Sequence, residues 1–159
     1  MIYLGADHRG YHLKEKIKAW FQQWNLPFED LGNQELDLKD DYPDFAARVA
    51  KKVVQYEREA VGIVICGSGV GVDVVANKFS KIRCGLGFSS QQIRKAVQDD
   101  DINILALPAD FLSDKKAKKI VEIFLKTEFG QEKDQKRRLK KIKKIEQENF
   151  KKQLMFKNF

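Results

Sequence analysis

The feature that most constrains the fold is a continuous apolar run, AVGIVIC, at Ala60–Cys66. A run of this length without charged residues is typical of a central parallel strand that is covered on both faces. It leads directly into a glycine-rich segment, Gly67–Gly71, which predicts a tight loop where the strand ends. The sequence therefore predicts an α/β protein in which a buried sheet lies between two helical layers.

Shorter apolar segments on both sides of this run predict further strands, and apolar residues at helical spacing lie between them. Strands that alternate with helices predict βαβ units and a doubly wound, five-stranded parallel sheet. Ser89, and either Ser113 or Asp114, are candidate N-caps of later helices. The helix after the glycine-rich loop is expected to run through about Phe79. The five predicted strands are Ile2–Gly5, Pro27–Leu31, Ala60–Cys66, Arg83–Phe88 and Ile102–Leu107.

The net charge of +7 is concentrated at one end of the chain. Residues 131–159 hold eleven Lys and Arg against four Asp and Glu, whereas residues 1–130 hold nineteen of each. We therefore divide the chain into an α/β domain, 1–130, and a basic C-terminal helix, 131–159, which begins near Lys133. Its apolar stripe packs either on a partner subunit or back on its own domain. The residues of that stripe are Leu139, Ile142, Ile145 and Phe150.

Composition argues against several functional classes. No window approaches the roughly 18 apolar residues of a membrane span, and the first residues lack the pattern of a cleavable signal, so a cytoplasmic location is expected. The basic segment has no aromatic stacking platform, so no nucleic-acid partner is predicted. Cys66 and Cys84 lack metal-type spacing and are expected to be free thiols, with Cys84 in the core. His12 is expected to be exposed.

The strongest chemical signal is the loop from Cys66 to Gly71, CGSGVG, at the carboxyl end of the central strand. Ligands of open α/β sheets bind beyond such strand ends. Glycines allow backbone amides to turn toward an anion, and the start of a helix favours negative charge and the thiolate form of cysteine. A nucleotide-binding loop is the main alternative, although the loop lacks the lysine of a P-loop. A purely structural, buried cysteine is another.

Polar residues follow two other predicted strands. Asp7 and His8 come directly after the first strand, and Tyr42 precedes Pro43 in the segment after the second. A carboxylate beside an imidazole is suited to moving protons on sugar hydroxyls. A polar surface loop, and a tyrosine that only packs on its helix, would produce the same pattern.

Together these segments resemble the ribose-5-phosphate isomerase type B and galactose-6-phosphate isomerase family over roughly residues 1–150. The resemblance is carried by GADHRGYHLK, DYPDFA, ICGSGVGV, ANKF and IRC. It implies a three-layer, flavodoxin-like Rossmann fold. It also implies interconversion of an aldose phosphate and a ketose phosphate, without metal or cofactor, in active sites assembled between two subunits.

The resemblance also assigns roles to single residues. It implies that Cys66 is the base that moves a proton between C1 and C2 of the sugar. Ser68 and Asp7 would handle substrate hydroxyls and ring opening. Some members carry a glutamate base just after the loop, where this chain has Val72. The implied substrate-binding residues are His8, Tyr42, Gly67, Gly69, Val70, Gly71 and Arg138.

The half of the family site that comes from the partner subunit matches less well. Asp99-Asp100 stand where the family has His-Asn, Asp110 ends the segment that replaces Gly-x-Arg, and Asp134 lies in the segment that replaces Gly-Arg-His. Of the two C-terminal phosphate-binding arginines, only Arg138 is matched. Aspartates near a phosphate would repel it, and lysines offer a point charge where arginine offers a planar fork.

Two assemblies and two functions follow from this partial match. The cysteine-bearing subunit of galactose-6-phosphate isomerase resembles this chain in lacking the histidine and in having a lysine-rich C-terminus, which favours a hetero-oligomer with a paralogous subunit. A self-sufficient homodimer or tetramer acting on ribose 5-phosphate is the other assembly. A noncatalytic subunit that binds sugar phosphate is the alternative function. A flavin or nucleotide carrier is suggested by fold class alone.

Overall fold

The computed structural model describes residues 1–156, and the side chains of these residues except 58 and 150–156. Its strands are all parallel and form one five-stranded sheet, as predicted. The strands are β1 (Ile2–Ala6), β2 (Phe28–Asp30), β3 (Val61–Cys66), β4 (Cys84–Leu86) and β5 (Ile104–Pro108). The helices are α1 (Tyr11–Gln23), α2 (Tyr42–Tyr56), α3 (Val70–Ala76), α4 (Ser90–Asp100), α5 (Asp114–Lys126) and α6 (Lys133–Phe156).

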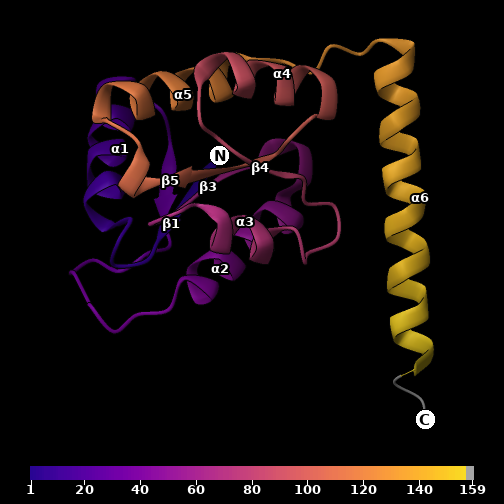
Figure 1. Ribbon diagram of the computed structural model, residues 1–159, viewed down its shortest axis with the longest axis horizontal. Coiled ribbons are helices and arrows are strands. Elements are labelled where there is room, and N and C mark those ends of the chain that lie inside the picture. Colours follow the sequence, from indigo (N-terminus) through magenta and orange to yellow (C-terminus); the bar gives the residue numbers. More distant parts are fainter. Residues whose placement is uncertain (157–159) are drawn as a thin grey trace.

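Helices cover both faces of the sheet, so the predicted three-layer Rossmann-like fold is confirmed. Helices α1, α4 and α5 pack on one face, and α2 and α3 pack on the other (Figure 1). The strand order is β2-β1-β3-β5-β4. It keeps the β2-β1-β3 half of the flavodoxin order but places β5, rather than β4, next to β3.

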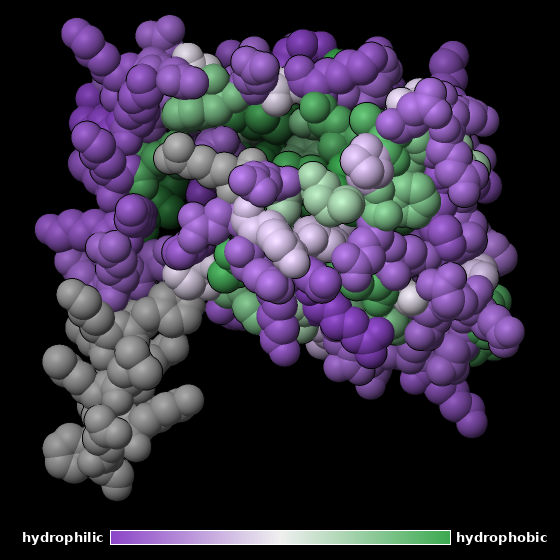
Figure 2. Space-filling view, turned by 180° about the vertical axis from the view of Figure 1, so that it is seen from behind, coloured by the Kyte–Doolittle hydropathy of each residue, from purple (hydrophilic) through white to green (hydrophobic). Residues whose placement is uncertain are grey.

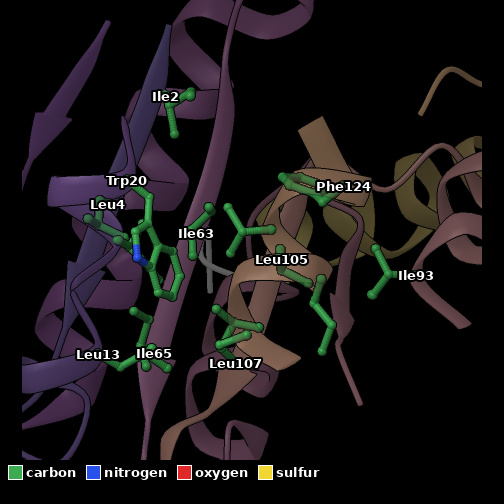
Figure 3. Packing of buried hydrophobic residues seen from close by; sticks show 14 of the residues in the cluster. Ile2, Leu4, Leu13, Trp20, Ile63, Ile65, Ile93, Leu105, Leu107 and Phe124 are labelled. Atoms are coloured by element: carbon green, nitrogen blue, oxygen red, sulfur yellow. The ribbon is translucent and has the colours of Figure 1, made fainter. Parts of the chain in front are cut away.

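The core explains why the central run is continuously apolar. Successive side chains of β3 point to opposite faces of the sheet, so Ile63 and Ile65 lie in one cluster and Val64 lies in the other. Figure 3 shows the first cluster, in which Ile63 and Ile65 lie near Trp20 of α1. Because both faces are covered by helices, neither alternate set of β3 side chains can be polar. Seen from behind, hydrophilic side chains cover most of the outer surface, with apolar ones gathered in a hollow (Figure 2).

Both predicted serine N-caps are confirmed, whereas the predicted end of one helix is wrong. Ser89 and Ser113 are both N-caps, and Ser89 Oγ accepts a hydrogen bond from the Gln92 amide at 3.1 Å. The expected continuation of α3 through Phe79 is wrong, because the helix ends at Ala76. There Asn77 binds both backbone groups of Cys84: its Nδ2 donates to the Cys84 carbonyl at 3.2 Å and its Oδ1 accepts from the Cys84 amide at 2.9 Å. This turns the chain directly into β4.

Helix α6 lies beside the α/β body (Figure 1). Gln135 Nε2 donates to Asp99 Oδ1 at 2.9 Å, and Glu146 Oε1 accepts from the Lys81 amide at 2.7 Å. The stripe residues Ile142 and Ile145 are 44% and 58% exposed. The side chain of Phe150, predicted to belong to this stripe, lies outside the described residues, as do residues 157–159 of the predicted C-terminal segment. Across residues 1–156, no helix is both long and apolar enough to cross a membrane.

Candidate active site

The Asp7-His8 pair follows the carboxyl end of β1, and Cys66 with its glycine loop lies at the carboxyl end of β3. These strands are neighbours, and Ala6 of β1 pairs in register with Ile65 of β3. The chain leaves β1 toward α1 on one face of the sheet and leaves β3 toward α3 on the other. Such a switch point is where open α/β sheets bind ligands. The Asp7 amide donates to the Ile65 carbonyl at 3.3 Å, which places Asp7 beside the strand end that carries Cys66.

The Cys66 thiol is free and lies at the end of β3, where the residue is only 4% exposed. The loop that follows it requires glycine at Gly69, whose φ of +74° is a conformation that L side chains rarely adopt. A Cβ at Gly69 would also lie 2.9 Å from the Pro108 backbone nitrogen. Ser68 is exposed, and its Oγ accepts from the Val70 amide at 3.3 Å. The glycine loop is therefore held in a single compact shape against β5.

Asp7 is the buried carboxyl group of the site, with 5% of the residue exposed. Its Oδ1 accepts a hydrogen bond from the Gly10 amide at 2.9 Å. Burial raises the pKa of Asp7, and this outweighs the opposite effects of the Gly10 amide and of His8. A carboxyl group whose pKa is raised keeps its proton to higher pH than an ordinary aspartate and is better suited to give a proton and take it back.

Tyr42, which the resemblance assigns to substrate binding, lies against the glycine loop. It is the first residue of α2 and is 39% exposed. A Cβ added to Gly71 would be 2.7 Å from Tyr42 Cε2, so the tyrosine ring packs directly on that glycine. Val72, the position at which some members of the resembled family carry a glutamate, is fully buried in the core between the sheet and α2.

Two charged partners of the site were missed from the sequence. Asp40, from the segment before α2, accepts hydrogen bonds from His8, and Asp110, from the segment after β5, forms an ion pair with Arg9. Arg9 Nε donates to Asp110 Oδ2 at 3.0 Å. Neither partner is signalled by spacing, because each lies on a different loop from the residue that it binds.

The position of Asp110 corrects one expectation. The resemblance assigned this segment to the half of a site contributed by the partner subunit. Instead, the Asp110 amide donates to the Gly67 carbonyl of the same chain at 3.0 Å. The repulsion expected from this aspartate is offset by Arg9, whose guanidinium lies over Gly67. This chain has Asp110 at the end of the segment that replaces Gly-x-Arg, and Asp110 and Arg9 together form an ion pair without net charge beside the glycine loop.

Arg138 is the predicted site residue that the fold does not bring to Cys66. It lies on α6, and its nearest acidic partner is Asp134, with the Arg138 Nη2 and Asp134 Oδ2 atoms 3.9 Å apart. Helix α6 contacts α4 rather than the carboxyl ends of β1 and β3. Basic side chains line a groove along this helix: Lys133, Lys136, Arg137, Lys140, Lys141 and Lys144.

In residues 1–156 no group of three or more His, Cys, Asp or Glu side chains is placed to hold a metal ion. The groups at the strand ends are instead a thiol, a carboxyl group with a raised pKa, an imidazole and a loop of backbone amides. This set can remove a proton from carbon, return it to a neighbouring carbon and stabilise negative charge on oxygen.

Comparison with known proteins identifies relatives that span nearly the whole chain. The sequence model of the family described as Ribose/Galactose Isomerase matches residues 2–142. Ribose-5-phosphate isomerase B of Mycobacterium tuberculosis is 33% identical over 138 residues, 87% of this chain and 85% of the relative.

Solved structures of relatives also match this chain over most of its length. The crystal structure of ribose-5-phosphate isomerase B from Mycoplasma genitalium with bound ribulose-5-phosphate has a TM-score of 0.89 at 39% identity, covering 92% of this chain and 96% of that one. Ribose-5-phosphate isomerase B of Clostridium thermocellum has a TM-score of 0.88 at 36% identity, covering 93% and 98%.

Proposed function

This chain belongs to the Ribose/Galactose Isomerase family and is a sugar-phosphate isomerase, and we propose that it interconverts ribose 5-phosphate and ribulose 5-phosphate. The observation that carries this choice of sugar is the relative with bound ribulose-5-phosphate, to which the chain is similar over 92% of its length. The placement of Cys66 and Asp7 at adjacent strand ends supports the reaction class, because an aldose–ketose isomerisation needs both a base and a proton carrier for the hydroxyl groups.

The proposed chemical step uses Cys66 as its base. The thiolate removes the proton from C2 of the open-chain aldose, and the electron pair forms the C1=C2 bond while negative charge develops on the former carbonyl oxygen. The same proton is returned to C1, and a proton moves from O2 to O1, which yields the ketose. Amides of Gly67, Gly69 and Gly71 would donate to the enediolate oxygens in this step. The fixed shape of the loop favours this role, because donors held in place need not reorganise during the reaction.

Asp7 is proposed to open the sugar ring. Its raised pKa lets the carboxyl group hold a proton to higher pH than an ordinary aspartate does, so it can exchange that proton with the ring oxygen or with a hydroxyl. Ser68, exposed at the mouth of the loop, would bind a substrate hydroxyl. The Val70 amide already lies 3.3 Å from Ser68 Oγ, so Val70 would donate to the enediolate only when Ser68 turns toward the substrate.

A second subunit completes the proposal. Exposed Ile142 and Ile145 on α6 leave an apolar stripe that a partner subunit would cover, and Arg138 on the same helix would then reach the partner's phosphate site. The C-terminal residues favour a hetero-oligomer, but the relatives named ribose-5-phosphate isomerase B match most of the chain, so we favour a homodimer or a pair of dimers. Residues 1–130 would then provide the proton-transfer groups and α6 the intersubunit helix. A cytoplasmic location belongs to the same proposal, because a catalytic thiol such as that of Cys66 needs a reducing compartment.

Replacing Arg138 with alanine is expected to raise KM for ribose 5-phosphate about tenfold and to change kcat by less than about threefold, because one charge-assisted contact to the phosphate is lost. Arg138→Lys should recover only part of the loss, since lysine lacks the planar fork. Lys144→Ala, on the same helix and paired with Glu148 at 3.9 Å, is the matched control. Steady-state kinetics measure all three, and an unchanged KM in Arg138→Ala would remove this residue from the site.

The function itself is tested with the purified chain alone, assayed on ribose 5-phosphate and on galactose 6-phosphate. Turnover of ribose 5-phosphate is the expected result. Turnover of galactose 6-phosphate instead, or only after a paralogous subunit is added, would replace the proposal with the hetero-oligomeric one. Binding of either sugar phosphate without turnover in any combination would establish a noncatalytic subunit.

A further inference from the structure

Asp40 is a nearly buried carboxylate whose two oxygens are both engaged. Its side chain is 6% exposed. Oδ1 accepts from the His8 backbone amide and from His8 Nδ1, both at 2.8 Å, and Oδ2 accepts from Asn33 Nδ2 at 3.0 Å. One carboxylate therefore holds both the backbone and the ring of His8, from a segment 32 residues away in the sequence.

This arrangement determines which ring nitrogen of His8 carries a proton. A carboxylate can only accept hydrogen bonds, so Nδ1 of His8 must be the donor to Asp40. The ring is thereby held with Nε2 as its remaining polar atom, on a side chain that is 29% exposed. His8 follows Asp7 in the same loop, so Nε2 belongs to the part of the molecule where the substrate is proposed to bind.

The carboxylate also changes how readily the ring is charged. The hydrogen bond to Asp40 raises the pKa of His8, and this outweighs the opposing effect of burial. The charged groups that act on the ring are Asp40, from the segment before α2, and Asp7, from its own loop. Both are acidic and favour the imidazolium form.

Asp40 itself is anchored to the buried interior. The side-chain amide of Asn33 donates to Asp40 Oδ2, and the backbone carbonyl of Asn33 accepts from Lys14 Nζ at 3.0 Å. The Lys14 side chain is fully buried and paired with Asp30. A continuous series of hydrogen bonds thus leads from a buried ammonium group to His8. The position of the imidazole is set by this series rather than by the surface loop alone.

We propose that Asp40 is a positioning residue of the isomerase, which holds His8 protonated on Nδ1 and presents Nε2–H to the phosphate group of the sugar. The proposal rests on the function proposed above, since it needs an anionic substrate. A protonated imidazole attracts a phosphate dianion and donates to it from Nε2, whereas in the neutral ring the one proton stays on Nδ1 and Nε2 can only accept. Because the pKa of His8 is raised, the contact persists to higher pH than with an ordinary histidine. It is lost as pH rises through the pKa of His8 in the folded protein.

The first test needs no substrate. His8 and His12 are the only two histidines in the chain, so their ring ¹⁵N and ¹H signals can be followed by NMR through a pH titration, with exposed His12 as an internal reference. In Asp40→Asn the midpoint of His8 should fall by about one pH unit or more, because an opposite charge in direct contact is lost. Asp40→Glu should keep part of the shift. The matched control is Asp37→Asn, an exposed aspartate of the same segment. An unchanged His8 midpoint in Asp40→Asn would overturn the proposal.

The second test separates positioning from general damage. At neutral pH, Asp40→Asn should raise KM for ribose 5-phosphate about tenfold, change kcat by less than about threefold, and weaken competitive inhibition by inorganic phosphate by the same factor as KM. The difference from the unmodified protein should shrink as pH is lowered and the imidazole of the variant is protonated again. An equal loss in kcat with KM unchanged would contradict a phosphate contact.

The two proposals fail in distinguishable ways. If the chain turns over no sugar phosphate, the proposed function fails, whereas the coupling of Asp40 to His8 is still decided by the NMR titration. In that case a titration of the His8 ring signals with inorganic phosphate replaces the kinetic test. If Asp40→Asn needs about tenfold more phosphate than the unmodified protein to reach the midpoint of the shift, the contact is supported. Identical midpoints would exclude it.

Discussion

Replacement of Cys66 with alanine is expected to lower kcat for the isomerisation of ribose 5-phosphate by about 10³-fold, with a much smaller change in KM. General base catalysis contributes about 10²- to 10⁴-fold, and in the proposed mechanism no other side chain can remove the proton from C2. Val72 is buried in the core and carries no base. Cys66→Ser should be nearly as inactive, because a hydroxyl group is a far weaker acid than a thiol. Steady-state kinetics on both sugars measure the loss.

Cys84→Ala is the matched control for this prediction. Cys84 is the other free thiol, at the start of β4, and burial raises its pKa well above the ordinary value. It should therefore remain a neutral thiol, and its removal should leave kcat within about twofold. Near-normal activity in a folded Cys66→Ala protein would exclude Cys66 as the base, and an equal loss in Cys84→Ala would show that the effect is not specific to Cys66. Thermal unfolding of both variants shows whether the fold is retained.

Replacement of Lys14 with methionine is expected to lower the free energy of unfolding at neutral pH by about 3 kcal/mol, the largest effect on stability that we predict. Removing one partner of a buried ion pair typically costs about 3–5 kcal/mol, because the other charge is left in a poor solvent. Asp30 would be that charge, with 8% of its side chain exposed. The expected loss lies at the low end because Lys18 Nζ, 2.8 Å from Asp30 Oδ2, still pairs with it.

The dependence of this effect on pH has a definite sign. Burial acts to raise the pKa of Asp30, but the hydrogen bonds from Lys14 and Lys18 hold it below its ordinary value. A lowered pKa in the folded state contributes stability above the pKa of the unfolded state, and this contribution is lost as pH falls through the folded pKa. The unmodified protein should therefore lose more stability on acidification than Lys14→Met does. Chemical denaturation at several pH values measures the difference.

The double variant Lys14→Met/Asp30→Asn tests the cause of the destabilisation. Removing both charges should restore a large part of the stability lost in Lys14→Met, because no unpaired carboxylate then remains buried. If the double variant is no more stable than Lys14→Met, lost packing of the long Lys14 side chain, rather than the stranded charge of Asp30, is responsible.

The sequence alone was sufficient for the element types, the parallel sheet and the ends of strands where chemistry can occur. Apolar periodicity, glycines and capping serines are local signals, and they placed Cys66, the glycine loop and Asp7 at strand ends on the same edge of the sheet. That these two strands are neighbours is a result of the structure. The role of Tyr42 was left open by the sequence, and its packing on Gly71 is a finding of the structure. Resemblance to a family added the reaction class and the roles of single residues. Local patterns by themselves left the choice open between an isomerase, a nucleotide carrier and a structural cysteine.

The tertiary structure determined which charged side chains pair with one another. The order of the last two strands, the pairing of His8 with Asp40 and the pairing of Arg9 with Asp110 all join segments far apart in the chain, by 32 and 101 residues for the two pairs. Such contacts depend on how loops from different strands converge on one edge of the sheet, and no periodicity or spacing records that. The sequence determined where the thiol and the glycine loop lie because their geometry is local. Only the fold brought Asp40 to His8 and Asp110 to Arg9, because both pairs form across loops.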